Sequence, residues 1–249
     1  MLQVHGLVKR FGGVLASDGI SLDVAAGQLR AVIGPNGAGK STLIGQLAGE
    51  IRPDGGQIIF NGRDITRLAM HRRSTFGLAR TFQITSLFHD FTVLDNVALA
   101  VQAHAGHSFR FWRAARRDTQ LRAPARAALA RVGLENRAEA ICASLSHGEH
   151  RQLEIAMALA TAPRMLLLDE PMAGLGPDES ARMITLLGEL KREQTILLIE
   201  HDMDAVFRLA DRITVLVNGR VIASGEPDEV RADAEVRRAY LGEQKVRHG

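Results

Sequence analysis

The stretch QLRAVIGPNGAGKST, residues 28–42, decides how the rest of the chain is interpreted. Residues 28–33 are a short apolar run typical of a buried strand. The pattern Gly34-x-x-x-x-Gly39-Lys40-Ser41 follows at once, and a helical spacing of apolar residues comes after it. A strand, a glycine loop and a helix in this order predict a phosphate-binding loop. Its backbone N–H groups turn inward around phosphate oxygens, and the helix adds its positive end.

Two side chains of this loop carry specific expectations. Lysine occurs only at positions 9, 40, 191 and 245, so the lysine inside the glycine loop stands out. Lys40 is predicted to reach the β- and γ-phosphates of a nucleotide, and the Ser41 hydroxyl to bind Mg²⁺. The alternative is an ordinary glycine turn with an exposed lysine. The position between a strand and a helix argues against that alternative.

The segment MLLLDE, residues 165–170, ends a second apolar strand with two carboxylates. Ligands of open α/β sheets bind at the carboxyl ends of the strands. We expect Asp169 to hold Mg²⁺ through water and Glu170 to polarise an attacking water as a general base. The alternative, a strand ending in a solvated acidic pair, loses weight because a phosphate-binding loop is present in the same chain.

The segment LSHGEHRQLEIA, residues 145–156, contains a helix start signal. Ser146 and Glu149 have the spacing of a capping box, and Leu153, Ala156 and Met157 begin one apolar helix face. A capping box is the plain structural interpretation. A helix amino terminus with an exposed serine and a glycine is also an anion site.

Composition limits the function classes. The 249 residues suit one large α/β domain with an inserted subdomain, and 31 basic against 28 acidic residues argue against a nucleic-acid partner. The single cysteine, Cys142, allows no intrachain disulfide. The amino-terminal residues do not resemble a secretory signal, and no run of 18 apolar residues is present, so we expect any membrane role to come through a partner.

The remaining pattern predicts mostly strands in the first 82 residues, helices in the middle and alternation afterwards. Continuous apolar strands such as MLLLD and TILLI favour a parallel sheet covered on both faces. Pro124 is interpreted as a first-turn proline, and Asn218-Gly219 as a hairpin turn. Strands are expected at 2–8, 20–25, 28–33, 57–60, 77–82, 165–169, 195–199, 213–217 and 221–223, and helices at 92–103, 123–132, from about 146 to 160, and at 177–190.

LSHGEHRQ resembles the signature motif of the ABC (ATP-binding cassette) ATPases, commonly LSGGQ. The order of motifs is also similar to that family: Walker A, glutamine loop, signature, Walker B, D-loop and switch histidine. The resemblance covers essentially the whole chain. It implies an α/β P-loop ATPase (RecA-like) core with an amino-terminal antiparallel β subdomain and an inserted helical subdomain. The implied bounds are 1–84 and 161–249 for the core, and 85–160 for the insertion.

The resemblance implies an ATPase that uses ATP and Mg²⁺, with each nucleotide between two cassettes. Ser146 and Gly148 would face the γ-phosphate held by the partner cassette. Phe11 would stack on adenine, and His201 would sense the γ-phosphate. The implied nucleotide-binding loop consists of Gly34, Pro35, Asn36, Gly37, Ala38, Gly39, Lys40, Ser41 and Thr42, and the implied Mg²⁺ residues are Ser41, Gln83 and Asp169.

Gln83, in ARTFQ, would be a catalytic contact that also faces a membrane subunit. Three positions depart from the family pattern: His147 replaces the commonest glycine, His150 the commonest glutamine, and Gly176 the common D-loop aspartate. These departures leave the geometry of the site facing the partner open.

The stretches GLARTFQ, DEPMAGLGPDE, LLIEHDMDAV and RAYLGE resemble the cassettes of branched-chain amino-acid importers. Cassettes for urea or short amides, and those of lipopolysaccharide export, look similar. The implied partners are integral membrane permeases, a second cassette (as a homo- or heterodimer) and, through the permease, a solute-binding protein. The implied place is the cytoplasmic face of a bacterial inner membrane, with no nucleic acid involved. A soluble ABC ATPase of DNA or the ribosome would carry coiled-coil, zinc or tandem modules that this chain lacks.

Two histidine pairs are candidate metal ligands. His104 and His107, and His147 and His150, have i, i+3 spacing, and Cys142 lies near the second pair. Neither pair has a convincing third ligand in the sequence, and the cysteine spacing matches no common zinc pattern. The basic, aromatic stretch at 109–122 is interpreted as a solvated helical face in preference to a lipid contact.

Overall fold

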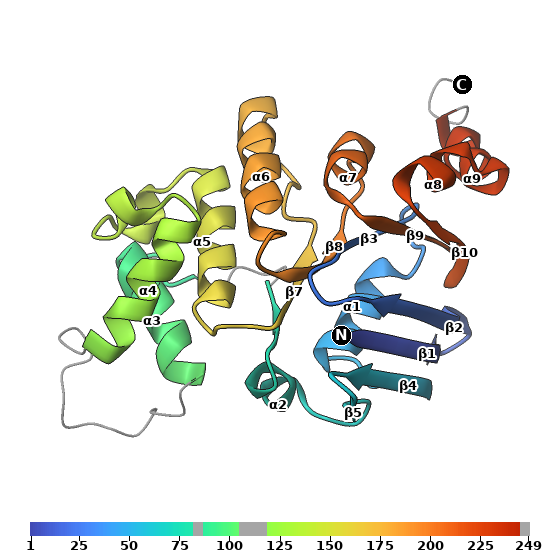
Figure 1. The fold of residues 1–249 in the computed structure, drawn as a ribbon, viewed down its shortest axis with the longest axis horizontal. Coiled ribbons are helices and arrows are strands. Elements are labelled where there is room, and N and C mark those ends of the chain that lie inside the picture. Colours follow the sequence, from blue (N-terminus) through green and yellow to red (C-terminus); the bar gives the residue numbers. More distant parts are fainter. Residues whose placement is uncertain (82–86, 105–118, 245–249) are drawn as a thin grey trace.

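The computed structural model describes residues 1–81, 87–104 and 119–244. It contains a four-stranded sheet of order β2-β1-β4-β5 and a six-stranded sheet of order β10-β9-β3-β8-β7-β6 (Figure 1). The strands are β1 Leu2–Phe11, β2 Val14–Val24, β3 Leu29–Ile33, β4 Gly55–Phe60, β5 Arg63–Asp64, β6 Leu78–Arg80, β7 Met165–Asp169, β8 Thr195–Ile199, β9 Arg212–Val217 and β10 Arg220–Gly225. The expected α/β class with a separate antiparallel sheet is confirmed.

The six-stranded sheet is parallel from β9 to β6, and only β10 pairs antiparallel. All residues of β3, β7 and β8 are buried, as expected for a sheet covered on both faces. Because the strands run in the same direction, the loops that follow β3, β6, β7 and β8 leave from one edge of the sheet.

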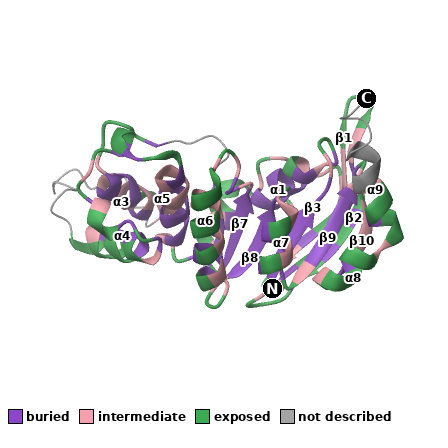
Figure 2. Cartoon of the chain, turned by 90° about the horizontal axis from the view of Figure 1, so that it is seen from above, coloured by how far each residue is buried: buried purple, intermediate pink, exposed green. Residues whose placement is uncertain are grey.

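Different elements cover the two faces. Side chains alternate along β7, so that Leu167 packs with helix α1 (Lys40–Ala48) and the antiparallel sheet, while Leu166 and Leu168 pack with the opposite layer. That opposite layer includes α6 (Pro177–Leu190) and α7 (Met203–Leu209), and Figure 2 shows the buried strands behind them. Helix α1 therefore lies between the two sheets.

The carboxyl end of α1 is held by a buried arginine from α2 (Met70–Thr75). The Arg73 side chain donates to the carbonyl oxygens of Gln46 and Leu47 at 2.7 Å, of Leu68 at 2.9 Å and of Thr66 at 3.0 Å. Burial lowers the pKa of Arg73 to about 10, which leaves the guanidinium charged at neutral pH. The last carbonyls of the helix are thereby satisfied by a side chain from outside it.

The middle of the chain is helical. Helices α3 (Val93–His104), α4 (Thr119–Arg131) and α5 (His147–Leu159) pack together, and the 3-10 turns η2 (Glu135–Arg137) and η3 (Cys142–Ser144) lie between α4 and α5. They form the part of the molecule to the left of α6 in Figure 1. Pro124 lies inside α4 and not in its first turn, so that prediction is wrong. The TQLR segment before it contains no stop signal and places the buried Leu121 toward the core, so the helix begins earlier.

The remaining elements agree with the sequence pattern. Strands β7 and β8 and helix α6 have the predicted bounds, and Asn218 and Gly219 have φ of 49° and 78° in the turn between β9 and β10. Helices α8 (Pro227–Ala232) and α9 (Ala234–Gln244) end the described part. None of the helices in the described residues combines the length and the apolar composition that spanning a bilayer requires.

Candidate nucleotide-binding site

Three loops meet at the carboxyl edge of the parallel sheet. The loop of residues 34–39 follows β3, Glu170 follows Asp169 of β7, and His201 comes just after β8. Because β3, β8 and β7 are neighbours in the sheet, the expected phosphate loop, carboxylates and histidine come from adjacent strands. The sequence predicted that these residues follow the ends of strands. The strand order shows in addition that these strand ends are next to one another.

The phosphate loop is shaped by glycines that leave no room for a side chain. A Cβ on Gly34 would lie 2.2 Å from the carbonyl oxygen of Leu216, and one on Gly39 2.3 Å from that of Ala16. Gly39 also has φ of 101°, a conformation that other residues rarely adopt. The loop is tied to the β9–β10 turn, since Gly219 N–H donates to the Ala38 carbonyl at 2.9 Å.

The Lys40 side chain is buried and folds back over the loop. Its Nζ donates to the carbonyl oxygens of Gly34 at 2.6 Å and Pro35 at 3.0 Å. The ammonium group is therefore held beside the loop whose N–H groups are expected to receive phosphate. Ser41, next in the chain, is exposed, and Thr42 is half-buried.

Asp169 is buried and paired with a residue that the sequence analysis did not single out. Arg80, at the end of β6, forms ion pairs with Asp169 at 2.9 Å and with Glu50. Burial raises the pKa of Asp169, while Arg80 opposes that shift. The second carboxylate oxygen, Oδ1, is buried and has no hydrogen-bond partner among the described residues.

This unpartnered oxygen tests whether the site suits Mg²⁺. Mg²⁺ binds through one or two protein oxygens and keeps several waters. Asp169 supplies a buried carboxylate oxygen whose bonding capacity is unused, and Ser41 supplies an exposed hydroxyl at the start of α1. The oxygen donors present therefore fit the cation. Gln83, the third expected Mg²⁺ residue, lies outside the described residues.

Glu170 has a strained backbone. Its φ is 49°, in the left-handed region that favours glycine, and its N–H donates to the Ile199 carbonyl at 2.9 Å. The residue is half-buried, and its backbone is held against the neighbouring strand β8.

A buried carboxylate that was not predicted from the sequence holds the backbone of His201. Glu200 is fully buried and accepts hydrogen bonds from the N–H groups of Met172 at 2.9 Å and His201 at 3.0 Å. Burial raises its pKa. Glu200 thus links the segment after β7 to the one after β8. The signal available was an acidic residue directly after the apolar strand TILLI.

The expected capping box of α5 is confirmed. Ser146 Oγ accepts from Glu149 N–H at 3.2 Å, and Glu149 accepts from Ser146 N–H at 2.7 Å. A second carboxylate, which the sequence did not reveal, also lies here. Glu179 of α6 accepts from the Gly148 N–H at 3.1 Å and from Ser146 Oγ at 3.2 Å. The Gly148 hydrogen bond holds the pKa of Glu179 below its usual value.

The two anion-binding helix ends lie apart within one chain. In both views α6 and β7 stand between α5 and α1 (Figures 1 and 2). The groups around Ser146 and those around Lys40 are therefore not arranged around a common phosphate in this chain.

Three further residues singled out from the sequence lie outside the loop and strand ends described above. Phe11 is exposed at the end of β1, with Lys9 Nζ 5.3 Å from its ring centre. His147 lies against the D-loop, where its Nε2 is 3.3 Å from the Ala173 carbonyl oxygen and would be 3.1 Å from a Cβ on Gly174. Gly176, at the N-cap of α6, has an ordinary φ of −71°.

Comparison with known proteins identifies the class. Residues 17–173 match the family model described as ABC transporter, and the chain belongs to this family of ATP-binding, ATP-hydrolysing cassettes. Within it, residues 220–246 match the model described as branched-chain amino acid ATP-binding cassette transporter.

Individual relatives and structures agree. The chain is 42% identical to the high-affinity branched-chain amino acid transport ATP-binding protein LivG of Salmonella typhimurium, over 98% of each chain. It is 40% identical to BraF of Pseudomonas aeruginosa, a protein of the same description, also over 98% of each. The ADP conformation of MJ1267, an ATP-binding cassette of an ABC transporter, superposes with a TM-score of 0.86 at 32% identity, covering 97% of this chain and 98% of that one.

Proposed function

We propose that this ABC ATPase powers the uptake of branched-chain amino acids or related small polar solutes. The observation that carries the proposal is the near full-length identity to LivG and BraF, 42% and 40%, together with the match of residues 220–246 to the branched-chain cassette model. The solute itself would be recognised by other subunits, so the role of this chain is to supply the energy.

The phosphates of ATP would be held by the loop after β3. The loop consists of Gly34, Pro35, Asn36, Gly37, Ala38, Gly39, Lys40, Ser41 and Thr42, and the backbone N–H groups of all of these except Pro35 would surround the phosphates. The hydrogen bonds of Lys40 to the loop carbonyls support this role, because they keep the ammonium group poised beside the phosphates. Phe11 would stack on adenine, a role consistent with its exposed side chain.

The Mg²⁺ that accompanies ATP would be held by Asp169, Ser41 and Gln83, and it supplies positive charge that offsets the charge on the phosphates. The buried, unpartnered Oδ1 of Asp169 supports this assignment. Arg80 is then a positioning residue, because its ion pair aims the other oxygen of the same carboxylate.

Glu170 would accept a proton from the attacking water, and His201 would contact the γ-phosphate. Both follow adjacent strands of the sheet, and the backbone of each is fixed by a hydrogen bond, to Ile199 and to Glu200 respectively. Rigid placement of a general base and an electrostatic contact is the arrangement that lowers a phosphoryl-transfer barrier.

A second cassette would complete each site. The separation of α5 from α1 within one chain supports this, because Ser146 and Gly148 can meet a γ-phosphate only if it is bound by another copy or a related chain. ATP would favour the closed dimer by contacting both cassettes, and hydrolysis would remove that preference. Residues 85–160 would act as the helical subdomain that carries the signature toward the partner.

Integral membrane permeases would bind at the exposed apolar side chains Phe88, Phe91 and Ile141. These are 53%, 42% and 47% exposed, and the rings of Phe88 and Phe91 stack at 5.2 Å. In the sequence, Phe88 and Phe91 follow shortly after Gln83. Apolar side chains gathered on a surface are typical of protein contacts. The cassette would then be peripheral, at the cytoplasmic face of the inner membrane, and a solute-binding protein would act through the permease.

The enzymatic part is tested by Mg²⁺-dependent ATP hydrolysis of the purified chain over a range of protein concentrations. We expect the specific activity to rise with concentration, and Glu170→Gln to bind ATP, stop turning over and become dimeric. Glu189→Gln, an exposed change on α6, is the matched control and should behave as the wild type. Hydrolysis that is first order in protein and indifferent to Glu170 would contradict both the base and the shared site.

The solute class is tested in a reconstituted complex of the cassette with its permeases in liposomes. Leucine, isoleucine or valine presented with the solute-binding protein should stimulate ATP hydrolysis more than urea does. Stimulation by lipopolysaccharide and not by amino acids would overturn the assignment to uptake.

A further inference from the structure

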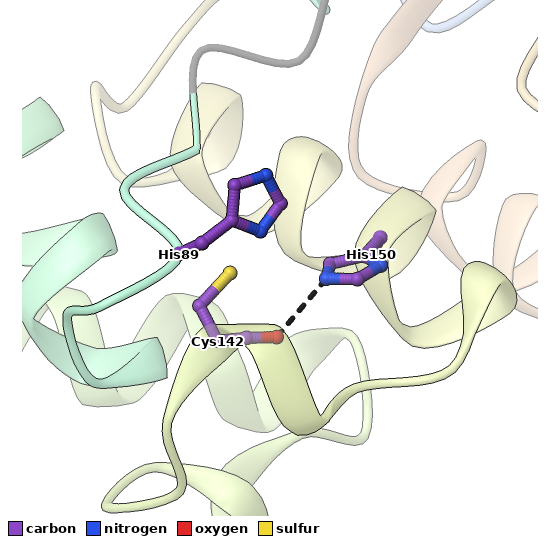
Figure 3. Close-up of side chains that lie close together, drawn as sticks. All are labelled: His89, Cys142 and His150. Carbon is purple, nitrogen blue, oxygen red and sulfur yellow. Dashed lines mark hydrogen bonds between the residues drawn. The ribbon is translucent and has the colours of Figure 1, made fainter.

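Three residues that could bind a metal ion come together away from the nucleotide-binding loop. His89 lies in the loop before α3, Cys142 begins η3, and His150 is in the first turns of α5. One ligand atom from each lies within 4.8 Å of the other two. Figure 3 shows the Cys142 sulfur below the His89 ring, with the His150 ring to the right of both. His89 is the third ligand that the sequence did not reveal, and His147 is not part of the group, because it contacts the D-loop.

The backbone already holds two of these segments together. Cys142 N–H donates to the Phe91 carbonyl at 2.8 Å, and Ala143 N–H donates to the His89 carbonyl at 3.0 Å. The main chains of His89 and Cys142 are therefore fixed relative to each other. A bound ion would have to order side chains only, which lowers the entropy cost of binding.

The third residue is fixed by its own helix and by a hydrogen bond. His150 Nε2 lies 3.0 Å from the Cys142 carbonyl oxygen, and the rings of His89 and His150 meet edge to face with centres 5.8 Å apart. In Figure 3 the nitrogen that makes this hydrogen bond is also the one that faces the sulfur. An ion would replace this hydrogen bond, a contact of modest net energy.

We propose that His89, Cys142 and His150 form a binding site for a thiophilic divalent metal ion of the Zn²⁺ class, with water as the fourth ligand. One thiolate and two imidazoles suit Zn²⁺ and not Mg²⁺ or Ca²⁺, which prefer oxygen. In a tetrahedral zinc site, ligand atoms lie about 3.5 Å apart, so the side chains need to close by about 1 Å. His89 is exposed, which leaves the ion an entry path and a place for water.

Binding exchanges a proton for the metal ion. Burial raises the pKa of the Cys142 thiol, so the free side chain carries its proton at neutral pH. The sulfur–metal bond forms as the sulfur–hydrogen bond breaks, and the proton leaves to solvent; no electron is transferred. The bound ion would connect the loop before α3, which contains His89, to helix α5, which begins in the signature segment.

The test uses the full-length, tag-free protein after treatment with a chelator. Co²⁺ is added first, because a cobalt–thiolate bond produces a charge-transfer absorption that histidine or carboxylate ligands do not produce. We expect this absorption to saturate at one Co²⁺ per chain, to disappear on addition of Zn²⁺, and to be absent in Cys142→Ala. Zn²⁺ should also raise Tm, since it binds only the folded arrangement.

His89→Ala, which changes an exposed side chain, and His150→Gln should each weaken Zn²⁺ binding at least about tenfold. His71→Ala, at an exposed position on α2, is the control and should bind as the wild type. The proposal is overturned if the wild-type protein gives no thiolate–cobalt absorption, or if His89→Ala binds Zn²⁺ as tightly as the control. Comparing Tm without metal shows that each variant is folded.

Discussion

Helices α1 and α5 both present an amino terminus to a candidate phosphate position, yet the two ends are built in opposite ways. α1 begins after Gly39 without a side-chain cap, and Lys40 bonds to loop carbonyls. α5 begins with a serine cap, and the Glu179 carboxylate accepts from Gly148 and Ser146. The α1 end leaves N–H donors for an incoming anion, whereas the α5 end already holds an anion of the protein itself.

This difference bears on the order of events in an ATP cycle. The amino end of α1 has no side-chain cap, so that end is preorganised for an incoming anion. An anion arriving at α5 must displace Glu179 or share its donors. Binding at α1 should therefore precede contact with α5, and the exchange at α5 is a step at which dimer formation can be slowed.

The largest expected effect on nucleotide binding comes from the amino end of α1. Lys40→Ala removes a buried cation and the two hydrogen bonds that hold it on the loop, and we expect ATP to bind about 10- to 100-fold more weakly. Isothermal titration with ATP and Mg²⁺ measures this. Lys191→Ala is the control, and equal affinities for both variants would mean that Lys40 does not reach the nucleotide.

The next effect concerns the other end of α1. Arg73→Met leaves four carbonyl oxygens without their guanidinium donor, and we expect a loss of about 3 kcal/mol in the free energy of unfolding. Urea denaturation measures it against Arg72→Met, a change at the exposed neighbouring position. If the two variants were equally stable, α1 would not depend on this anchor.

A smaller effect is expected at the α5 end. Ser146→Ala removes the capping oxygen and should cost about 1 kcal/mol, a fall in Tm of about 2–4 °C. Ser180→Ala, within α6, serves as the control. A Tm unchanged by the loss of Ser146 would show that Glu179 alone satisfies the helix end.

The smallest effect is a pair of opposite pH dependences. Burial raises the pKa of Asp169 above its ordinary value of 3.8. Ionisation of Asp169 therefore lowers the stability of the folded state as the pH rises from the ordinary pKa through the raised one. The pKa of Glu179 is lowered from 4.5, so its ionisation adds stability that is lost as the pH falls. We therefore compare the Tm of each variant with that of the wild type at the same pH. As the pH increases from about 3 to about 7, this difference should become more positive for Asp169→Asn and more negative for Glu179→Gln.

Thermal unfolding of both variants and the wild type at several pH values measures how each Tm difference changes with pH. Parallel slopes for the two variants would mean that the two carboxylates experience the same kind of surroundings. That outcome would remove the contrast between the buried Asp169 beside the α1 end and the hydrogen-bonded Glu179 at the α5 end.

The sequence predicted what is local. Strands β7 and β8 and helix α6 depend on the periodicity of apolar residues, and they have the predicted bounds. The capping box depends on Ser146 and a residue three positions later, and it has the predicted hydrogen bonds. The fold class and the family followed from motif order. The assigned roles of the loop, of Glu170 and of His201 stay predictions that the experiments above test.

What the sequence did not predict depends on segments far apart in the chain. Glu179 contacts Ser146 across 33 positions and Arg80 contacts Asp169 across 89. Such pairs follow from strand order and helix docking, which periodicity does not encode. His89 was missed as a neighbour of Cys142 and His150 for the same reason. Pro124 was placed in a first turn because proline is common there, whereas α4 begins at Thr119 and contains Pro124 in its interior.

The arginine anchor of α1 also has a consequence for how the chain acquires its structure. A helix of nine residues such as α1 is too short to persist alone in water. Its carboxyl end is completed by Arg73, which is made 25 residues after Ala48, once β4, β5 and α2 have followed. During synthesis the phosphate loop is therefore present long before its helix is secured. The ability to bind nucleotide should appear only after the segment through α2 has emerged and docked.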